Sequence, residues 1–287
     1  MRIRATVAAV SGALALSALV VPAAHAATSL VVPAAHAATS SGTPYTLDAG
    51  FSGVTIAKAI KVGTTNEVST KYTYTLTHGA GVDIAAKDFY TDAFLYRGSF
   101  DDPSAELYGD DAATCTATSA TTATCTGTID IRPAGGDLTN AGAGSWKVAA
   151  EAIAFNGQDP NSPDMSKVGY KDQDGLGATL VQRYSKLTVD ASPEPVYKGK
   201  TLTVTGKLSR ANWEDHLYHG YSGQPVKLQF RKAGTSTYTT VKTVYSDSTG
   251  NLKTTATASY DGYWRYSFAG TSTTPAVSAT GDYVDVK

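Results

Sequence analysis

The segment from Trp213 to His219 (WEDHLYH) holds the side chains best suited to bind a metal ion. His216 and His219 lie three residues apart and follow two carboxylates, Glu214 and Asp215. Imidazole and carboxylate groups are ligands of zinc and copper. A structural zinc site needs four well-placed ligands, and the flanking sequence predicts a loop between strands rather than a helix on which this spacing would converge. The segment is therefore either a metal site or a solvated polar loop.

The same loop, residues 210–224, concentrates three aromatic residues, Trp213, Tyr218 and Tyr221. Exposed aromatic rings combine apolar area with a polar tip, so they can stack on sugars or fill a pocket in a partner. Binding sites on β scaffolds usually lie on loops. Two interpretations stay open: a ligand-binding loop, or rings that cap the domain's own core.

An acidic turn suggests calcium. Asp172 and Asp174, in the run Asp172–Gly175 (DQDG), match half of a calcium-loop pattern. Carboxylate oxygens in a flexible turn can bind extracellular calcium. The first acidic position and the distal glutamate of an EF-hand are missing, and no helix is predicted on either side. We expect no cofactor, with calcium at this turn as the open possibility and a plain hydrophilic turn as the alternative.

Catalytic motifs are poorly represented. The run Gly220–Gly223 (GYSG) resembles the nucleophile elbow of hydrolases, but it lacks that motif's full spacing and the helix that follows it. No glycine-rich phosphate loop opens a predicted helix. We predict that the protein is not an enzyme. The alternative is a site assembled from Asp and Glu residues that are scattered along the chain.

Composition and charge bound the class of protein. The chain has 287 residues, 17% charged and 42% hydrophobic, which is too apolar for a disordered polyelectrolyte and long enough for two domains. A net charge of −1 argues against a nucleic-acid partner. Residues 41–183 carry 10 basic and 17 acidic side chains, a net −7, whereas residues 184–287 carry 12 and 8, a net +4. We predict two domains with these bounds; drift of solvated residues is the alternative explanation of the asymmetry.

Residues 1–37 have the pattern of a signal peptide. Arg2 and Arg4 precede an uncharged apolar stretch, and the eleven residues LVVPAAHAATS then occur twice in tandem. Each copy contains a small-residue cleavage site, after Ala26 and after Ala37. Prolines interrupt the stretch, which is short of the roughly 20 residues of a membrane span. We predict a secreted protein without stable membrane insertion.

Export determines how the two cysteines are interpreted. Cys115 and Cys125 flank a turn-like run rich in Ser, Thr and Ala. A cysteine pair in an oxidising compartment usually forms a disulfide. A reactive thiol pair would need a neighbouring base or CxxC spacing, and neither is present. We predict a structural disulfide across a β-hairpin.

Alternation of apolar and polar residues predicts strands throughout the chain, without a helical period over any twelve residues. The predicted strands of the first half are Lys71–Thr77, Phe89–Arg97, Ala112–Thr118, Thr122–Ile131, Ser145–Phe155 and Ala178–Arg183; those of the second half are Leu187–Asp190, Thr201–Leu208, Val226–Lys232, Tyr238–Tyr245, Leu252–Ser259, Tyr263–Ala269 and Tyr283–Lys287. Trp146 is expected to fill a core. Parallel strands would need crossover helices, so we predict an all-β chain of two tandem antiparallel β-sandwich domains.

Several runs of the second half resemble bacterial immunoglobulin-like domains, in particular those of secreted actinobacterial proteins of unassigned function. They are KLTVDASPEPV (186–196), KGKTLTVTGKL (198–208), GYSGQPVKLQFRK (220–232), GNLKTTA (250–256) and GYWRYSFAG (262–270). The run GSWKVAAEAIAFNG (144–157) is similar to the penultimate hairpin of such domains. The resemblance implies an immunoglobulin-like sandwich, a modular role in adhesion, spacing or binding, and no catalytic residues.

Together these patterns predict a secreted, non-catalytic structural, adhesive or binding module. Its expected partner is a cell-wall polymer, a glycan or another protein, bound through loops and sheet faces. The alternative is a carbohydrate- or calcium-binding extracellular protein.

Overall fold

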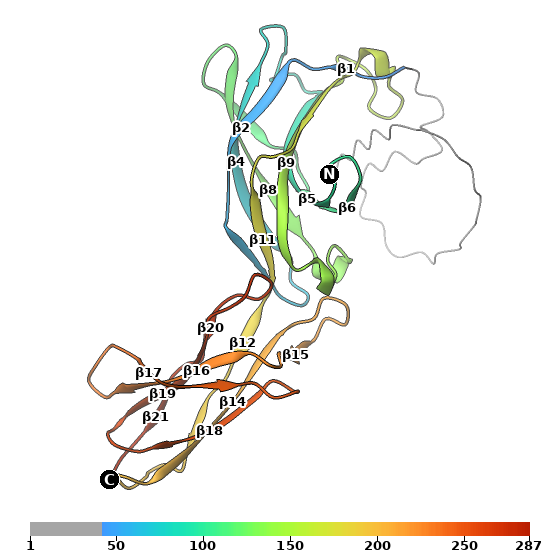
Figure 1. Ribbon diagram of the computed structural model, residues 1–287. Coiled ribbons are helices and arrows are strands. Elements are labelled where there is room, and N and C mark those ends of the chain that lie inside the picture. Colours follow the sequence, from blue (N-terminus) through green and yellow to red (C-terminus); the bar gives the residue numbers. More distant parts are fainter. Residues whose placement is uncertain (1–41) are drawn as a thin grey trace, which may run out of the picture. The chain divides into compact units, whose positions relative to one another are not determined.

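A computed structural model describes residues 42–287, and the predicted signal peptide lies outside them. The described chain is built from strands, as predicted, and contains no α-helix (Figure 1). No helix in this part of the chain is long and apolar enough to cross a membrane. Three short 3-10 helices interrupt the strands: η1 (Pro133–Gly135), η2 (Asn140–Gly142) and η3 (Met165–Lys167).

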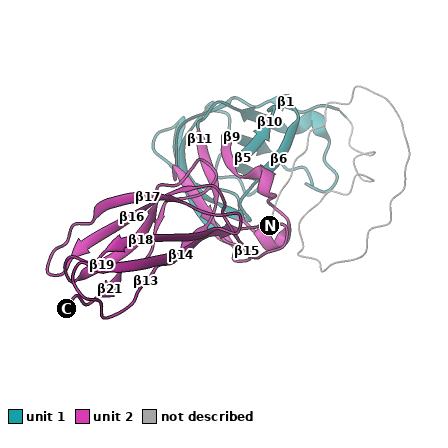
Figure 2. Ribbon diagram, turned by 60° about the horizontal axis from the view of Figure 1, so that its bottom comes forward, with its two compact units in different colours: residues 1–56, 69–130, 147–177 teal, residues 57–68, 131–146, 178–287 magenta. Residues whose placement is uncertain are grey.

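The chain divides into two compact units (Figure 2). The first comprises the residues up to Ile56, Ser69–Asp130 and Lys147–Gly177; the second comprises Ala57–Val68, Ile131–Trp146 and Ala178–Lys287. Segments from the first half of the sequence therefore belong to the same unit as the C-terminal half. The predicted domains, 41–183 and 184–287, stay a prediction.

The first unit contains most residues of two sheets. One sheet has the strand order β2-β4-β8-β7, from β2 (Ala49–Ile56), β4 (Val68–His78), β8 (Thr122–Ile131) and β7 (Thr114–Ala117). In the other sheet, five strands lie side by side in this order: β1 (Tyr45–Thr46), β10 (Gly169–Gln173), β9 (Gly144–Ala154), β5 (Phe89–Gly98) and β6 (Pro103–Leu107).

Tyrosines of β4 join the two sheets of this unit. Tyr72 and Tyr74 lie on the buried face of β4 because the strand alternates apolar and polar residues. The Tyr74 hydroxyl is 2.7 Å from Oγ1 of Thr91 on β5, which in turn donates to the Glu151 carbonyl oxygen at 2.7 Å. These bonds satisfy hydroxyl groups that burial would otherwise leave unpaired.

The predicted disulfide is confirmed. Cys115 on β7 and Cys125 on β8 lie directly opposite each other in the hairpin and are bonded. Ser and Thr side chains close the turn between them: Oγ of Ser119 lies 2.6 Å from Oγ1 of Thr122. The hairpin forms one edge of its sheet.

The C-terminal part of the second unit is a sandwich of two antiparallel sheets. In one, β14 (Thr201–Ala211) pairs with β12 (Ser185–Leu187), β13 (Asp190–Ser192), β15 (Tyr218–Gly220) and β18 (Asn251–Thr257). In the other, β17 (Thr239–Tyr245), β16 (Pro225–Lys232) and β19 (Gly262–Phe268) are adjacent, and β19 also pairs with β20 (Val277–Ser278) and β21 (Asp282–Val284).

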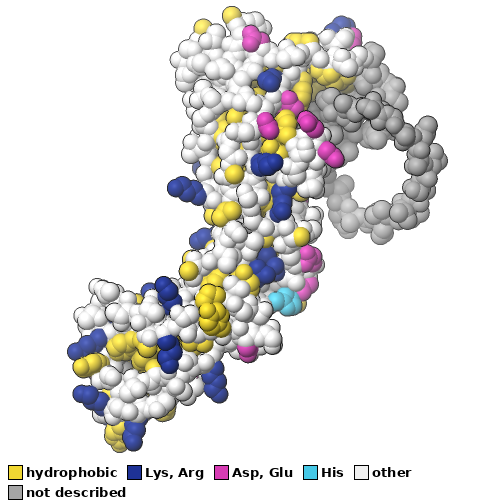
Figure 3. Space-filling view, in the orientation of Figure 1, with side chains coloured by type: hydrophobic (Ala, Val, Ile, Leu, Met, Phe, Trp, Pro, Cys, Tyr) yellow, Lys and Arg dark blue, Asp and Glu magenta, His cyan; other side chains and the backbone are white. Residues whose placement is uncertain are grey.

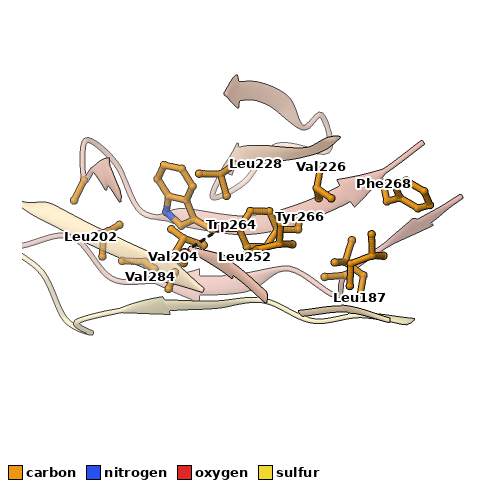
Figure 4. Close-up of a cluster of buried hydrophobic side chains, with 14 of the residues drawn as sticks. Leu187, Leu202, Val204, Val226, Leu228, Leu252, Trp264, Tyr266, Phe268 and Val284 are labelled. Atoms are coloured by element: carbon orange, nitrogen blue, oxygen red, sulfur yellow. Dashed lines mark hydrogen bonds between the residues drawn. The ribbon is translucent and has the colours of Figure 1, made fainter. Parts of the chain in front are cut away.

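Three aromatic residues of β19 fill the core between these sheets (Figure 4). Trp264, Tyr266 and Phe268 alternate with polar residues and all point inward. The Tyr266 hydroxyl donates to the Val204 carbonyl oxygen on the opposite sheet at 2.9 Å. Its ring lies so close to Gly206 that a Cβ atom there would be 2.8 Å from it, so this position of β14 requires glycine.

Two strand pairs are parallel, which the sequence analysis had disfavoured. β1 pairs with β10, and β3 (Ala59–Val62) pairs with β11 (Ala178–Arg183), both in parallel. The expectation was wrong because strands distant in sequence need no crossover helix: more than 100 residues separate each pair, and the strands in between make the connection. The strands β1, β2, β3, β6, β10, β15 and β20 were not predicted, and β15 (Tyr218–Gly220) lies within the segment 210–224 that was expected to be a loop.

Removal of the disulfide should destabilise the first unit. Opening the loop of ten residues lowers the free energy of unfolding by about 2–3 kcal/mol in the chain-entropy description. Denaturant unfolding of the Cys115→Ala/Cys125→Ala variant, compared with the oxidised and the reduced native chain, measures this loss. Equal stability of oxidised and reduced protein would contradict the assignment of a stabilising role.

Candidate ligand-binding site

Trp213 is in the interior, which agrees with the second of the two interpretations, a ring that caps the core. It is only 1% exposed. Its Nε1 donates to the Gly63 carbonyl oxygen at 3.0 Å, within the second unit. The aromatic pattern could not distinguish an exposed ring from this buried one, because the segment that covers Trp213 is 150 residues away in sequence.

Tyr218 and Tyr221 are partly buried, and cations of the chain itself cover their rings. Nζ of Lys186 lies 3.7 Å from the Tyr218 ring centroid, and the guanidinium carbon of Arg210 lies 3.9 Å from that of Tyr221. The Tyr221 ring also packs edge-on against Phe268, at 5.8 Å between centroids. Ligand binding by these two tyrosines stays a prediction.

Polar contacts of the same loop are also internal to the second unit. The Asn140 backbone N–H donates to Oε1 of Glu214 at 2.8 Å, and its side-chain amide donates to Oδ1 of Asn212 at 2.6 Å. The Trp213 backbone N–H donates in return to Oδ1 of Asn140 at 3.1 Å. These hydrogen bonds therefore hold the Asn140 segment against the C-terminal sandwich.

The predicted metal ligands do not come together. His219 Nε2 is 2.6 Å from Oδ2 of Asp215, whereas His216, with a positive φ of 60°, has a buried Nδ1 without a hydrogen-bond partner. Asp172 lies in strand β10 rather than in a turn, and Asp174 accepts a 3.5 Å hydrogen bond from Tyr96. No group of three or more His, Cys, Asp or Glu in residues 42–287 is arranged to hold a metal. Calcium binding stays a prediction.

A row of carboxyl groups, which no sequence motif predicted, crosses three strands of the first unit. Asp92 on β5 lies opposite Glu151 on β9, which lies opposite Asp172 on β10. Glu151 accepts a hydrogen bond from the Tyr170 hydroxyl at 3.1 Å, and Asp92 accepts one from the Tyr72 hydroxyl at 3.2 Å. The sequence could have indicated Glu151 as a buried acid, since it is the one charged residue in the apolar run VAAEAIAF.

Burial makes the two inner carboxyl groups weak acids. It raises the pKa of Asp92 to about 7, with a further contribution from Asp111. It raises the pKa of Glu151 to about 8, and the nearby carboxylates of Asp92, Glu106 and Asp172 act in the same direction. Glu151 is 6% exposed, so a substrate could reach it only after a local rearrangement, and the pair offers little support for catalysis.

A groove on the C-terminal sandwich offers a place for a ligand. It lies between the strands β17 and β18 and has a volume of about 1010 Å³. Trp264 and Phe230, which pack on the core, form its apolar part. Tyr260 and Val241 are 52% and 46% exposed beside it. The remaining lining residues are polar or small: Thr201, Lys232, Thr235, Thr237, Thr239, Lys242, Thr255, Ala256, Thr257 and Ser259.

Two edge strands form the walls of this groove. β17 pairs only with β16, and β18 pairs only with β14, among the described strands. Nζ of Lys242 on β17 donates to the Thr255 carbonyl oxygen on β18 at 2.6 Å, which ties the two edges together. In Figure 3, Lys and Arg side chains surround hydrophobic ones on this sandwich, with few acidic side chains in view.

No known protein family and no curated protein matches this sequence. Among solved structures, the chain is similar to the adhesin InvE of Yersinia pseudotuberculosis, with 12% identity and a TM-score of 0.23 over 80% of this chain and 58% of that one. It is also similar to Dpr2 Ig1-Ig2 in complex with DIP-Theta Ig1-Ig3, with 11% identity and a TM-score of 0.26 over 83% and 98% of the two chains. This chain thus spans little more than half of the adhesin's length. Similarities this low assign neither a family nor a ligand.

Replacement of Trp213 tests its structural role. Trp213→Phe keeps a ring but leaves the Gly63 carbonyl oxygen without its donor, so the free energy of unfolding should fall by about 1–3 kcal/mol. Leu217→Ala, at a residue 61% exposed in the same loop, is the control and should change stability by less than about 0.5 kcal/mol. Denaturant unfolding measures both, and equal effects would contradict the role given to Trp213.

The carboxyl row predicts that stability falls as pH rises. Because Asp92 and Glu151 have raised pKa values when folded, the native state binds more protons than the unfolded chain between about pH 4 and pH 8. Their contribution is complete below the unfolded pKa and is lost through pH 7–8. Glu151→Gln keeps an acceptor for Tyr170 and removes the titration, so its melting temperature should depend less on pH over that range. An identical pH dependence in both proteins would contradict this assignment.

Proposed function

We propose that the protein is an extracellular, non-catalytic binding module that holds a segment of an extended ligand in the groove between β17 and β18. The observation that carries this proposal is the groove itself, because a volume of about 1010 Å³ lined by rings, hydroxyls and ammonium groups provides both contact area and directional partners. Walls formed by two strand edges favour an elongated ligand over a compact one.

The chemistry of the lining supports binding rather than bond-making. The described residues around the groove include no carboxylate, imidazole or thiol, which are the side chains that most often act as acid, base or nucleophile. Thr hydroxyls and Lys ammonium groups can instead hold a ligand by hydrogen bonds. An adhesive or structural role for the module agrees with this lining.

An extracellular location is part of the proposal. The predicted signal peptide supports it, and so does the Cys115–Cys125 disulfide, since disulfides persist in oxidising compartments. A groove that faces outward on a secreted protein could reach a cell-wall polymer, a glycan or another protein.

Substitution of Tyr260 tests the groove. Tyr260→Ala should weaken retention on the ligand by about 2–10-fold, because an exposed ring that stacks on a ligand loses this contact. Tyr245→Ala is the matched control, since Tyr245 is 68% exposed on β17 but does not line the groove. Purified protein is passed over immobilised cell-wall polymers, neutral and acidic polysaccharides, and proteins. Equal retention of the two variants on every surface that binds the native chain would refute the proposal.

A further inference from the structure

The charge of the groove is one-sided. Lys232 and Lys242 line it, and the described lining contains neither Asp nor Glu. The nearest carboxylate in sequence, Asp261, accepts a hydrogen bond from the Val286 backbone N–H at 2.8 Å and so serves the C-terminal strand end. A ligand that enters this groove meets two lysines and no carboxylate among the described lining residues, which favours an anion.

Lys242 points into the groove because of the strand register. It lies opposite Leu228, whose side chain is fully buried, and directly opposed residues of antiparallel strands share a face. The Thr255 carbonyl oxygen accepts one of the three N–H donors of the ammonium group. Lys242 is exposed to solvent, so the donors of its ammonium group that Thr255 leaves unused are open to an anionic ligand.

Tyr260 lies near two cations, Lys232 of the lining and Lys198. Nζ of Lys232 lies 4.4 Å from its ring centroid, and Nζ of Lys198 lies 5.7 Å away. The ring is therefore a half-exposed platform with the Lys232 ammonium group over part of it. A sugar ring can pack its C–H face on such a platform while a carboxylate on the same sugar meets a lysine.

Hydroxyl groups dominate the rest of the lining, with six threonines and one serine. A hydroxyl both donates and accepts hydrogen bonds, so it matches the hydroxyl groups of a sugar in either direction. A nucleic acid would place much denser negative charge against only two lining lysines, and it fits less well.

The edge strands are poorly suited to an added peptide strand. The register of β16 and β17 shifts between Leu228 and Gln229, which marks a bulge at Val241, and Lys242 faces inward beside it. Bulges and inward-facing charges are the devices that prevent strand addition at a sheet edge. On β18, Lys242 already occupies the Thr255 carbonyl oxygen.

We propose that the ligand of this groove is an acidic polysaccharide, a linear glycan whose carboxylates meet Lys232 and Lys242 while its sugar rings pack on Tyr260. This inference rests on the proposed function of the groove and adds the chemical class of the ligand. The two lysines and the hydroxyl-rich lining are the observations that support this inference.

The experiment compares acidic glycans with the same backbones after loss of charge. Purified full-length protein is titrated by calorimetry with polygalacturonate, alginate and hyaluronate, with the methyl ester of each, and with polyglutamate and single-stranded DNA. At least one acid should bind about tenfold more tightly than its ester, and added salt should weaken that binding. Lys232→Gln and Lys242→Gln should each weaken it about 2–5-fold, whereas the exposed lysine variants Lys227→Gln and Lys253→Gln, outside the groove, should not.

The outcomes separate the inference from the function on which it rests. Two results overturn the glycan inference and leave the binding groove in place, as long as Tyr260→Ala still weakens binding. One is equal affinity for acid and ester, and the other is binding only of an acidic peptide or of single-stranded DNA. Loss of binding in the Lys227 and Lys253 variants as well also overturns it. If Tyr260→Ala changes no interaction, the proposed function fails too. The melting temperatures of all variants show that each remains folded. Lys232→Gln is the variant that removes no hydrogen bond between described residues of the protein.

Discussion

The hydrogen bond from the Tyr266 hydroxyl to the Val204 carbonyl oxygen connects the two sheets of the C-terminal sandwich through their apolar core (Figure 4). Burial raises the pKa of Tyr266 to about 12, so the hydroxyl keeps its proton and donates. The bond holds the Tyr266 face of β19 against the opposite sheet. Trp264 lies on the same face, so it is also part of the core, and it lines the groove. The groove therefore depends on the same alternation that builds the core.

The two units place their charged groups differently. In the first, carboxyl groups of Asp92 and Glu151 are enclosed between strands and held by tyrosine hydroxyls, where burial favours their neutral forms. In the C-terminal sandwich, lysines remain near solvent around an exposed aromatic ring. The buried acids are expected to affect stability, and the proposed ligand site lies among the exposed lysines.

Local pattern predicted those elements whose partners are close in sequence. The strands Thr122–Ile131 and Ala178–Arg183 have the predicted bounds, and the hairpin disulfide followed from a separation of ten residues. Predictions were less successful where distant segments decide the environment. The aromatic pattern left open whether Trp213 binds a ligand or caps the core, and a segment from the first half of the chain, which accepts its indole hydrogen bond, decides for the core. The run Asp172–Gly175 was interpreted as a calcium-binding or plain hydrophilic turn, but its first two residues end strand β10, which pairs with β9, a strand distant in sequence.

The sequence by itself determined the strand-rich architecture and the pairing of the cysteines, because alternation with period two and a short loop are properties of neighbouring residues. The tertiary structure alone decided which aromatic rings are exposed, which carboxyl groups are buried together and where two sheet edges leave a groove. Lys242 and Tyr260 carry no motif in the sequence. They become neighbours of one groove only because β17 and β18 pack beside each other, and burial and register depend on contacts that no local pattern contains.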